Sequence, residues 1–125
     1  MFMSKYKDQT YAAFRIVFGL LFMLHGTSKI FNVPVWAAAD QAPAFIKWFS
    51  GGIELVAGAM ILVGFMASWA AFLASGLMAA AYWMAHGLNS LFPHDNGGET
   101  AILYCFGFLV IAAHGSGIWS VDRAR

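Results

Sequence analysis

Five ionisable side chains that could do chemistry lie inside long apolar stretches of this sequence or at their edges. They are His25, Lys29, Glu54, His86 and Glu99. An ionisable group in apolar surroundings is costly, so each of them needs a partner or a function. Histidine and lysine donate hydrogen bonds to an oxygen, and a carboxylate accepts or relays a proton. The pattern therefore indicates either buried ion pairs or a site for a polar ligand.

The stretches that carry these residues have the composition of membrane spans. Hydrophobic residues make up 61% of the 125-residue chain and charged residues only 10%, whereas soluble domains contain about 25% charged residues. A membrane helix needs about 20 mostly apolar residues. Four segments meet or approach that length, at about residues 10–31, 49–65, 68–86 and 98–114. We therefore expect one all-α domain over residues 1–125, a four-helix transmembrane bundle whose outer surface contacts the lipid bilayer.

The connections between the predicted spans differ in length. Only a few residues around 64–68 join the second span to the third, which predicts an antiparallel hairpin. A single long helix is the alternative, because Gly64 alone is a weak helix breaker. Residues 36–48 mix alanines with polar residues and are bracketed by Trp36 and Trp48. Tryptophan favours the membrane interface, so we expect a short interfacial helix or re-entrant turn there.

The distribution of lysine and arginine predicts the orientation of the spans. Lys5, Lys7, Arg15, Arg123 and Arg125 lie towards the two ends of the chain, whereas the 86–98 connection has no lysine or arginine. Cytoplasmic segments carry an excess of these residues. We therefore expect a multi-pass protein of the bacterial inner membrane with both termini in the cytoplasm. The first apolar segment is interpreted as a retained span rather than a signal peptide, because Arg15 lies inside it and no cleavage site follows it immediately.

Two of the predicted helices carry a stripe that is typical of helix packing. The first stripe contains Arg15, Gly19, Phe22, His25, Gly26 and Lys29, and the second contains Ser68, Phe72, Ser75, Gly76, Ala79, Trp83 and His86. These spacings place each set on one face of its helix. Glycine permits close helix approach, so we expect both faces to pack against other helices.

The five ionisable residues gather on one side of the bundle when the alternating directions of the spans are followed. His25 and Lys29 lie in the outer half of the first span, and His86 ends the third. Glu54 and Glu99 each follow a glycine pair at the predicted start of a span. A carboxylate at that position is stabilised by the helix dipole, which explains the glutamates but not the neighbouring cations.

Three interpretations of this outer cluster are open from the sequence. Lys29 can form a structural ion pair with Glu54 or Glu99. Alternatively, the cluster binds a polar head group such as that of a quinone. The ligand-binding candidates are then His25, Lys29, Trp83 and His86, and the catalytic candidates, which handle the proton, are Glu54 and Glu99. A metal site would use His25, His86, His94 and a glutamate, but no two histidines have the spacing of common helical metal motifs, so we predict no metal site.

Two features lie outside the outer cluster. Arg15 and Asp122 are expected on the cytoplasmic side, where we predict that they form a structural ion pair. Cys105 is the single cysteine, so the chain has no internal disulfide and no dithiol chemistry of its own.

Several short motifs follow one another along the chain. They are Arg15 with Phe18-Gly19, His25-Gly26-x-x-Lys29-Ile30-Phe31, Gly52-Ile53-Glu54-Leu55 with Gly58, His86-Gly87, Asn96-Gly97-Gly98-Glu99 before Leu103-Tyr104, and Gly117-x-Trp119-Ser120-x-Asp122. In this order and spacing they resemble the DoxX family of small bacterial membrane proteins over nearly the whole chain. The resemblance implies a four-helix membrane protein. It also implies a redox theme, because relatives are associated with quinone-linked thiosulfate oxidation, with membrane complexes that handle thiol or oxidative stress, and with resistance to catechols and quinones.

These observations lead to one leading hypothesis and two alternatives. We expect a quinone-associated subunit of a membrane redox system, for sulfur-compound oxidation or for defence against oxidative and quinone stress, as part of a quinone-linked oxidoreductase. The sequence has no flavin, haem or iron–sulfur signature, so we expect a redox protein partner to exchange the electrons. The alternatives are a non-catalytic membrane assembly subunit and a small-molecule transporter, which would need a homo-oligomer. The formal net charge of +1 argues against a nucleic-acid partner.

Overall fold

Four long helices make up most of the chain that the computed structural model describes, which is residues 1–31, 33, 44–85 and 99–124. In chain order the elements are η1 (Ser4–Tyr6), α1 (Lys7–Phe31), α2 (Ala44–Val63), α3 (Ala67–Ala85), α5 (Glu99–His114) and α6 (Val121–Ala124). The all-α prediction is confirmed. The predicted spans at about 10–31, 68–86 and 98–114 agree closely with α1, α3 and α5.

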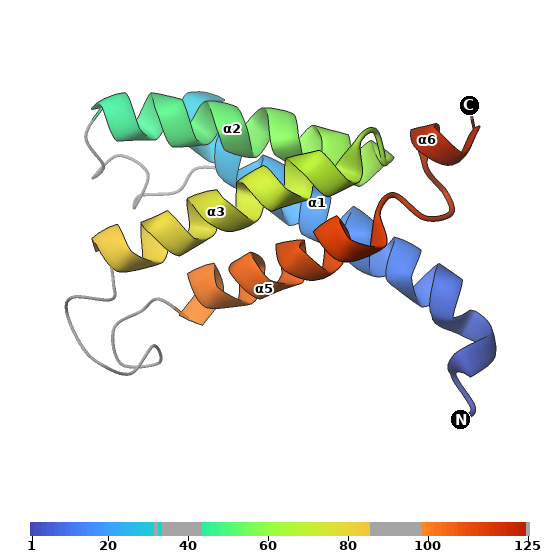
Figure 1. Ribbon diagram of the computed structural model, residues 1–125. Coiled ribbons are helices and arrows are strands. Elements are labelled where there is room, and N and C mark those ends of the chain that lie inside the picture. The colour runs from blue at the N-terminus through green and yellow to red at the C-terminus, as the bar shows by residue number, and fades with distance from the viewer. Residues whose placement is uncertain (32, 34–43, 86–98, 125) are drawn as a thin grey trace.

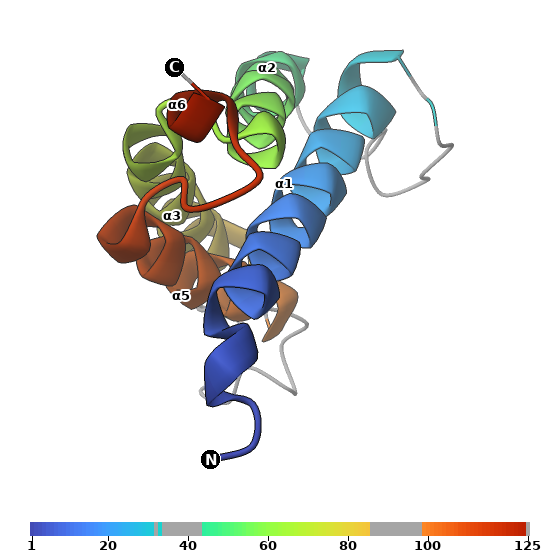
Figure 2. The ribbon, with the colours of Figure 1, turned by 90° about the vertical axis from the view of Figure 1, so that its right-hand side faces the viewer.

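The four helices surround a common core, as a view along the bundle shows (Figure 2). The most extensive contacts are those of α1 with α2 and of α3 with α5. Both chain ends lie at one end of the bundle (Figure 1). The end of α1, the start of α2, the end of α3 and the start of α5 lie at the other end. Residues far apart in the sequence, such as those at the end of α1 and the start of α5, are therefore placed at the same level.

Glycines allow the backbones of α1 and α2 to approach closely. A Cβ added to Gly19 would lie 2.5 Å from Leu62 N, and one added to Gly26 would lie 2.5 Å from Leu55 N. Gly58 of α2 is crowded in the same way by the backbone of α1. No side chain fits at such distances, because they are shorter than real Cβ contacts. The prediction that the glycine face of the first span packs against another helix is confirmed.

The connection between α2 and α3 is a tight turn over residues 64–66. Gly64 has a φ of 77°, a left-handed conformation that suits glycine. Its N–H donates to Ile61 O at 3.2 Å, and Phe65 N–H donates to Met60 O at 2.9 Å. This pair of hydrogen bonds is the Schellman motif, which ends a helix by satisfying its last carbonyls. The predicted antiparallel hairpin is therefore confirmed, and the single long helix is excluded (Figure 1).

Apolar side chains from all four helices fill the core. Phe22, Ile61, Phe108 and Ile111 are the largest apolar side chains that are almost fully buried. They pack with the small alanines of α3, namely Ala67, Ala70, Ala71 and Ala74. Alanines on this face let α3 lie close to the larger side chains of its neighbours.

The outer surface of the bundle is also apolar. Large exposed side chains include Phe45, Trp48 and Phe49 of α2, Trp69, Phe72, Leu73 and Trp83 of α3, and Leu103 and Phe106 of α5. Apolar surface of this extent is typical of contact with lipid or a partner. Among the described residues, Ser4–Phe31 and Ala44–Val63 are long and apolar enough to cross a membrane, and Glu99–His114 is a shorter apolar helix.

The predicted packing face of the third span is wrong for its large residues. Phe72 and Trp83 are 63% and 61% exposed, and a Cβ added to Gly76 would meet nothing within 4 Å. Only Ser75 among the central residues of that stripe is buried. The helical period is as predicted, but α3 is rotated so that a face of alanines points to the core. Of its aromatic rings, Tyr82 is buried, whereas Trp69, Phe72 and Trp83 face outwards.

The second span begins earlier than predicted. α2 starts at Ala44 rather than near Phe49, so residues 44–48 of the expected interfacial helix are the first residues of α2. No proline or glycine lies between Ala44 and Gly51 to delay the start of the helix. Residues 36–43 of that expected helix lie outside the described part of the chain.

Candidate functional site

Lys29 and Glu54 form an ion pair between α1 and α2. Lys29 Nζ lies 2.6 Å from Glu54 Oε1, and the two side chains are 16% and 2% exposed. Lys29 stands in the last turn of α1. Gly26, about one turn earlier, lets the backbone of α2 at Leu55 approach α1, which brings the neighbouring Glu54 within reach. The sequence left Glu54 and Glu99 as possible partners of Lys29, and in the structure the partner is Glu54.

Ser50 completes the surroundings of the Lys29 ammonium group. Lys29 Nζ donates to Ser50 Oγ at 3.1 Å, and Ser50 Oγ donates to Ile46 O at 2.7 Å. An ammonium group has three N–H donors, and these contacts use two of them. Glu54 Oε2 is buried and has no hydrogen-bond partner within the described part of the structure. Among the described residues, the ion pair therefore leaves one N–H of Lys29 and one oxygen of Glu54 without a hydrogen-bond partner.

His25 and Tyr104 flank the ion pair. His25 lies one turn before Lys29, and its Nδ1 is 2.9 Å from Leu21 O. The His25 ring meets the Tyr104 ring edge to face, with centroids 5.6 Å apart. Both side chains interact electrostatically with Glu54. Because Tyr104 belongs to α5, three helices contribute to this site.

The other predicted site residues have different surroundings. Glu99 is the first residue of α5 and is exposed. Trp83 lies on the outer surface, where its ring meets the ring of Tyr82 at 5.2 Å. His86 is outside the described residues. Within the residues that are described, no three His, Cys, Asp or Glu side chains are grouped to hold a metal ion. The structure thus brings together His25, Lys29 and Glu54 from the predicted outer cluster.

Sequence reasoning missed Ser50 and Tyr104 and misplaced Glu54 within its helix. Ser50 stands four residues before Glu54 in α2, a spacing that puts both on one helix face and could have identified it. Tyr104 has no such local signal, because its contact depends on how α5 packs against α1. Glu54 lies in the middle of α2 rather than near its start. The helix dipole acts within the first turn and so does not account for this carboxylate.

At the opposite end of the bundle, Arg15 is fully buried. Its Nε donates to Ile61 O at 3.1 Å. Its two Nη atoms donate to Ser116 O, to Ile118 O at 2.9 Å and to Trp119 O at 2.7 Å. All four of these hydrogen bonds end on backbone carbonyls. Arg15 therefore fastens the segment after α5 to the end of α2.

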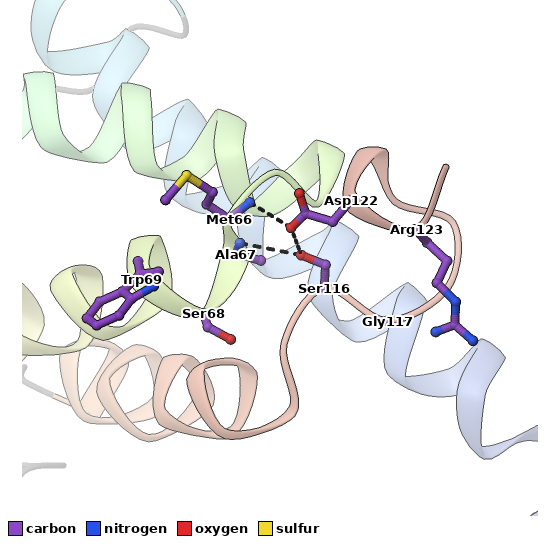
Figure 3. Close-up of a pocket in the computed structure, with 8 residues that line it drawn as sticks. All are labelled: Met66, Ala67, Ser68, Trp69, Ser116, Gly117, Asp122 and Arg123. Carbon is purple, nitrogen blue, oxygen red and sulfur yellow. Dashed lines mark hydrogen bonds between the residues drawn. The ribbon is translucent and has the colours of Figure 1, made fainter. Parts of the chain in front are cut away.

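Asp122 lies at the same join and holds the start of α3. Its Oδ2 accepts hydrogen bonds from Met66 N at 2.8 Å and from Ser116 Oγ at 2.7 Å (Figure 3). Its backbone N–H donates to Gly64 O at 3.1 Å. The hydrogen bonds of Arg15 end on backbone carbonyls rather than on the Asp122 carboxylate that we predicted as its partner. Both residues nevertheless attach the end of the chain to the helix bundle.

A pocket of about 360 Å³ opens beside this join. Met66, Ala67, Ser68, Trp69, Ser116, Gly117, Asp122 and Arg123 line it (Figure 3). The Ser116 hydroxyl and the Asp122 carboxylate are bonded to each other and to the start of α3. These polar groups are therefore engaged in holding the fold, in contrast to the unmatched oxygen of Glu54.

Comparison with known proteins places this arrangement in a family. The family described as DoxX matches the chain over residues 11–87, which includes Arg15, His25, Lys29 and Glu54. An uncharacterized protein of Haemophilus influenzae is 34% identical over 126 residues, covering 97% of this chain and 94% of its own length. No solved structure matches the chain. On the family match and on the length of the shared sequence, the chain belongs to the DoxX family of membrane proteins.

Proposed function

We propose that this protein is a quinone-associated subunit of a membrane redox system and that Lys29, Glu54 and His25 bind the quinone head group. One observation carries the proposal. A buried ion pair in a membrane protein keeps an unmatched carboxylate oxygen, Glu54 Oε2, among the described residues. Ionisable groups inside a membrane domain that are not fully matched are functional candidates by default.

The chemistry of the site suits an aromatic ligand that carries oxygen atoms. Lys29 has a spare N–H for a ligand oxygen, and the partly exposed His25 ring, backed by the buried Tyr104 ring, provides aromatic surface next to it. Glu54 is positioned to take up or release a proton when the ligand changes its redox state. In this proposal these residues bind, orient and exchange protons, and a redox protein partner exchanges the electrons.

The proposed orientation places this site near the outer face of the bacterial inner membrane. Both chain ends lie at one end of the bundle (Figure 1), and that end carries Lys5, Lys7 and Arg123. By the positive-inside rule, this end faces the cytoplasm. Lys29 stands in the last turn of α1, towards the opposite end, and reaches Glu54 in the middle of α2, so a quinone would approach the pair from the lysine side.

Binding of a short-tail quinone to the purified protein, followed by quenching of tryptophan emission, tests the proposal. Saturable binding is expected for the native chain. The double variant Lys29→Met/Glu54→Leu removes both charges together and should abolish binding. Glu99→Gln, the matched change at an exposed glutamate, should leave it intact. Circular dichroism verifies that each variant is folded.

Absence of saturable binding by the native chain across ubiquinone and menaquinone analogues would refute the quinone proposal. Binding that survives in the double variant would refute the assignment of the site. The first result would favour the alternative of a non-catalytic assembly subunit, in which the ion pair serves only to hold α1 and α2 together.

A further inference from the structure

The hydrogen-bonding groups left over at the ion pair are one donor and one acceptor. Lys29 Nζ bonds to Ser50 Oγ at 3.1 Å and to Glu54 Oε1 at 2.6 Å, which leaves one of its three N–H groups for a ligand. Glu54 Oε2 has no partner among the described residues. Both spare groups belong to side chains that touch each other, so a single ligand atom can meet both.

The two redox forms of a quinone differ in how they match this pair. A quinone carbonyl oxygen only accepts hydrogen bonds, so it can satisfy Lys29 but leaves Glu54 Oε2 bare. A hydroquinone hydroxyl both accepts and donates. It can accept from Lys29 Nζ and donate to Glu54 Oε2 at the same time.

The burial of Glu54 makes the difference in binding free energy between the hydroquinone and the quinone large. Its side chain is only 2% exposed, and a buried acceptor without a hydrogen bond carries its full desolvation penalty. Lys29 is 16% exposed, so the pair is reachable from the lysine side. A ligand hydroxyl that donates a hydrogen bond to Glu54 Oε2 removes the penalty, and a ligand oxygen that can only accept does not.

We propose that the Lys29–Glu54 site binds the reduced, dihydroxy form of its aromatic ligand in preference to the quinone form, with one ligand hydroxyl accepting from Lys29 Nζ and donating to Glu54 Oε2. This inference rests on the proposed function, because it concerns the same site. It assigns Glu54 Oε2 as the atom that selects the redox form. Ser50 acts as a positioning residue, because it holds the ammonium group next to that oxygen.

Calorimetric titration of the detergent-purified full chain under anaerobic conditions tests the preference. The probes are tetramethyl-1,4-benzoquinone and its hydroquinone, whose fully substituted ring does not add to the Cys105 thiol. The hydroquinone should bind at least about tenfold more tightly, since hydrogen bonds to charged groups are the stronger kind. Glu54→Gln replaces the acceptor with an amide that can also donate, so the preference should fall to parity or reverse. Glu99→Gln should keep the native preference.

The outcomes separate the two proposals. If the native chain binds the quinone as tightly as the hydroquinone, the redox preference is wrong while the proposed site stands. If it binds neither, the proposed function itself fails. A Glu54→Gln variant that is folded and keeps the native preference would also overturn the assignment of Oε2.

A measurement on the native chain covers the case in which Glu54→Gln does not fold. In infrared difference spectra, hydroquinone should shift one carboxylate stretching band, in the native chain and in Glu99→Gln alike. The quinone should leave that band in place. A carboxylate spectrum that hydroquinone does not change would contradict the proposal.

Discussion

Two buried charged sites stand on the same helix and are satisfied in opposite ways. Arg15 and Lys29 are fourteen residues apart in α1, or about 21 Å along the helix. Arg15 donates four hydrogen bonds to backbone carbonyls of α2 and of the segment after α5. Lys29 instead meets a side-chain carboxylate that keeps one oxygen without a partner in the described structure.

The difference separates a structural role from a chemical one. The carbonyls that accept from Arg15 belong to the backbone, so the guanidinium group holds two chain segments, the end of α2 and the segment after α5, in fixed positions. Such a site contributes rigidity and has little left to offer a ligand. At the Lys29–Glu54 pair, one N–H and one carboxylate oxygen have no partner among the described residues. Buried polar groups are normally hydrogen-bonded, so these two can bind a polar ligand.

The largest expected effect is the loss of Arg15. Arg15→Met takes the donor from four carbonyl groups, of which Ile61 O keeps the Gly64 N–H as a second donor. The cost is about 1–3 kcal/mol for each of the others that stays buried. We expect the free energy of unfolding to fall by about 4 kcal/mol or more, measured by denaturation in detergent micelles. Arg15→Lys should recover only part of this, because an ammonium group has three donors and no planar fork. Near-native stability of Arg15→Met would show that water can replace the guanidinium group and that Arg15 is not needed to hold the two chain segments together.

A smaller effect is expected at the ion pair, and it should depend on which charges are removed. Lys29→Met leaves Glu54 buried without its counter-charge and should cost about 3 kcal/mol of stability. The double variant Lys29→Met/Glu54→Leu should be more stable than Lys29→Met, because replacing a buried pair by apolar side chains is often neutral. Thermal unfolding of both variants in the same detergent measures the difference. A double variant less stable than Lys29→Met would mean that the pair, like Arg15, is needed for the fold.

The sequence predicted the helices well because their signals are local. Four apolar stretches and the Gly64 turn correspond to α1, α2, α3, α5 and the hairpin. The glycine face of α1 was also predictable, since Gly19 and Gly26 recur with the helical period on one side. What the sequence could not decide was rotation about a helix axis where both faces are apolar. Alanines and aromatic rings of α3 both suit a membrane protein, and only packing determines which of them face the core.

The candidate site was predictable in its charges but not in its pairing. The predicted group of five residues contained the three that the structure brings together, His25, Lys29 and Glu54, although Glu54 lies deeper in its helix than expected. The choice of Glu54 over Glu99 for Lys29 depends on the close approach of α1 and α2, and the contact with Tyr104 depends on the packing of α5. The partners of Arg15 were missed because they are backbone carbonyls, and the sequence does not identify those.

The smallest expected effect concerns the close helix contact on which the ion pair depends. Gly26→Ala places a Cβ within 2.5 Å of Leu55 N, so α1 and α2 must separate beside Glu54. We expect a loss of about 1–3 kcal/mol, as for other overpacked sites, and weaker hydroquinone binding because the Lys29–Glu54 geometry changes. Gly76→Ala is the matched control, since its added Cβ meets nothing within 4 Å and alanine stabilises a helix by about 0.5–1 kcal/mol relative to glycine. Equal stability and equal hydroquinone binding in the two variants would show that the contact at Gly26 does not position the pair. The close approach of α1 and α2 would then not explain why Lys29 meets Glu54.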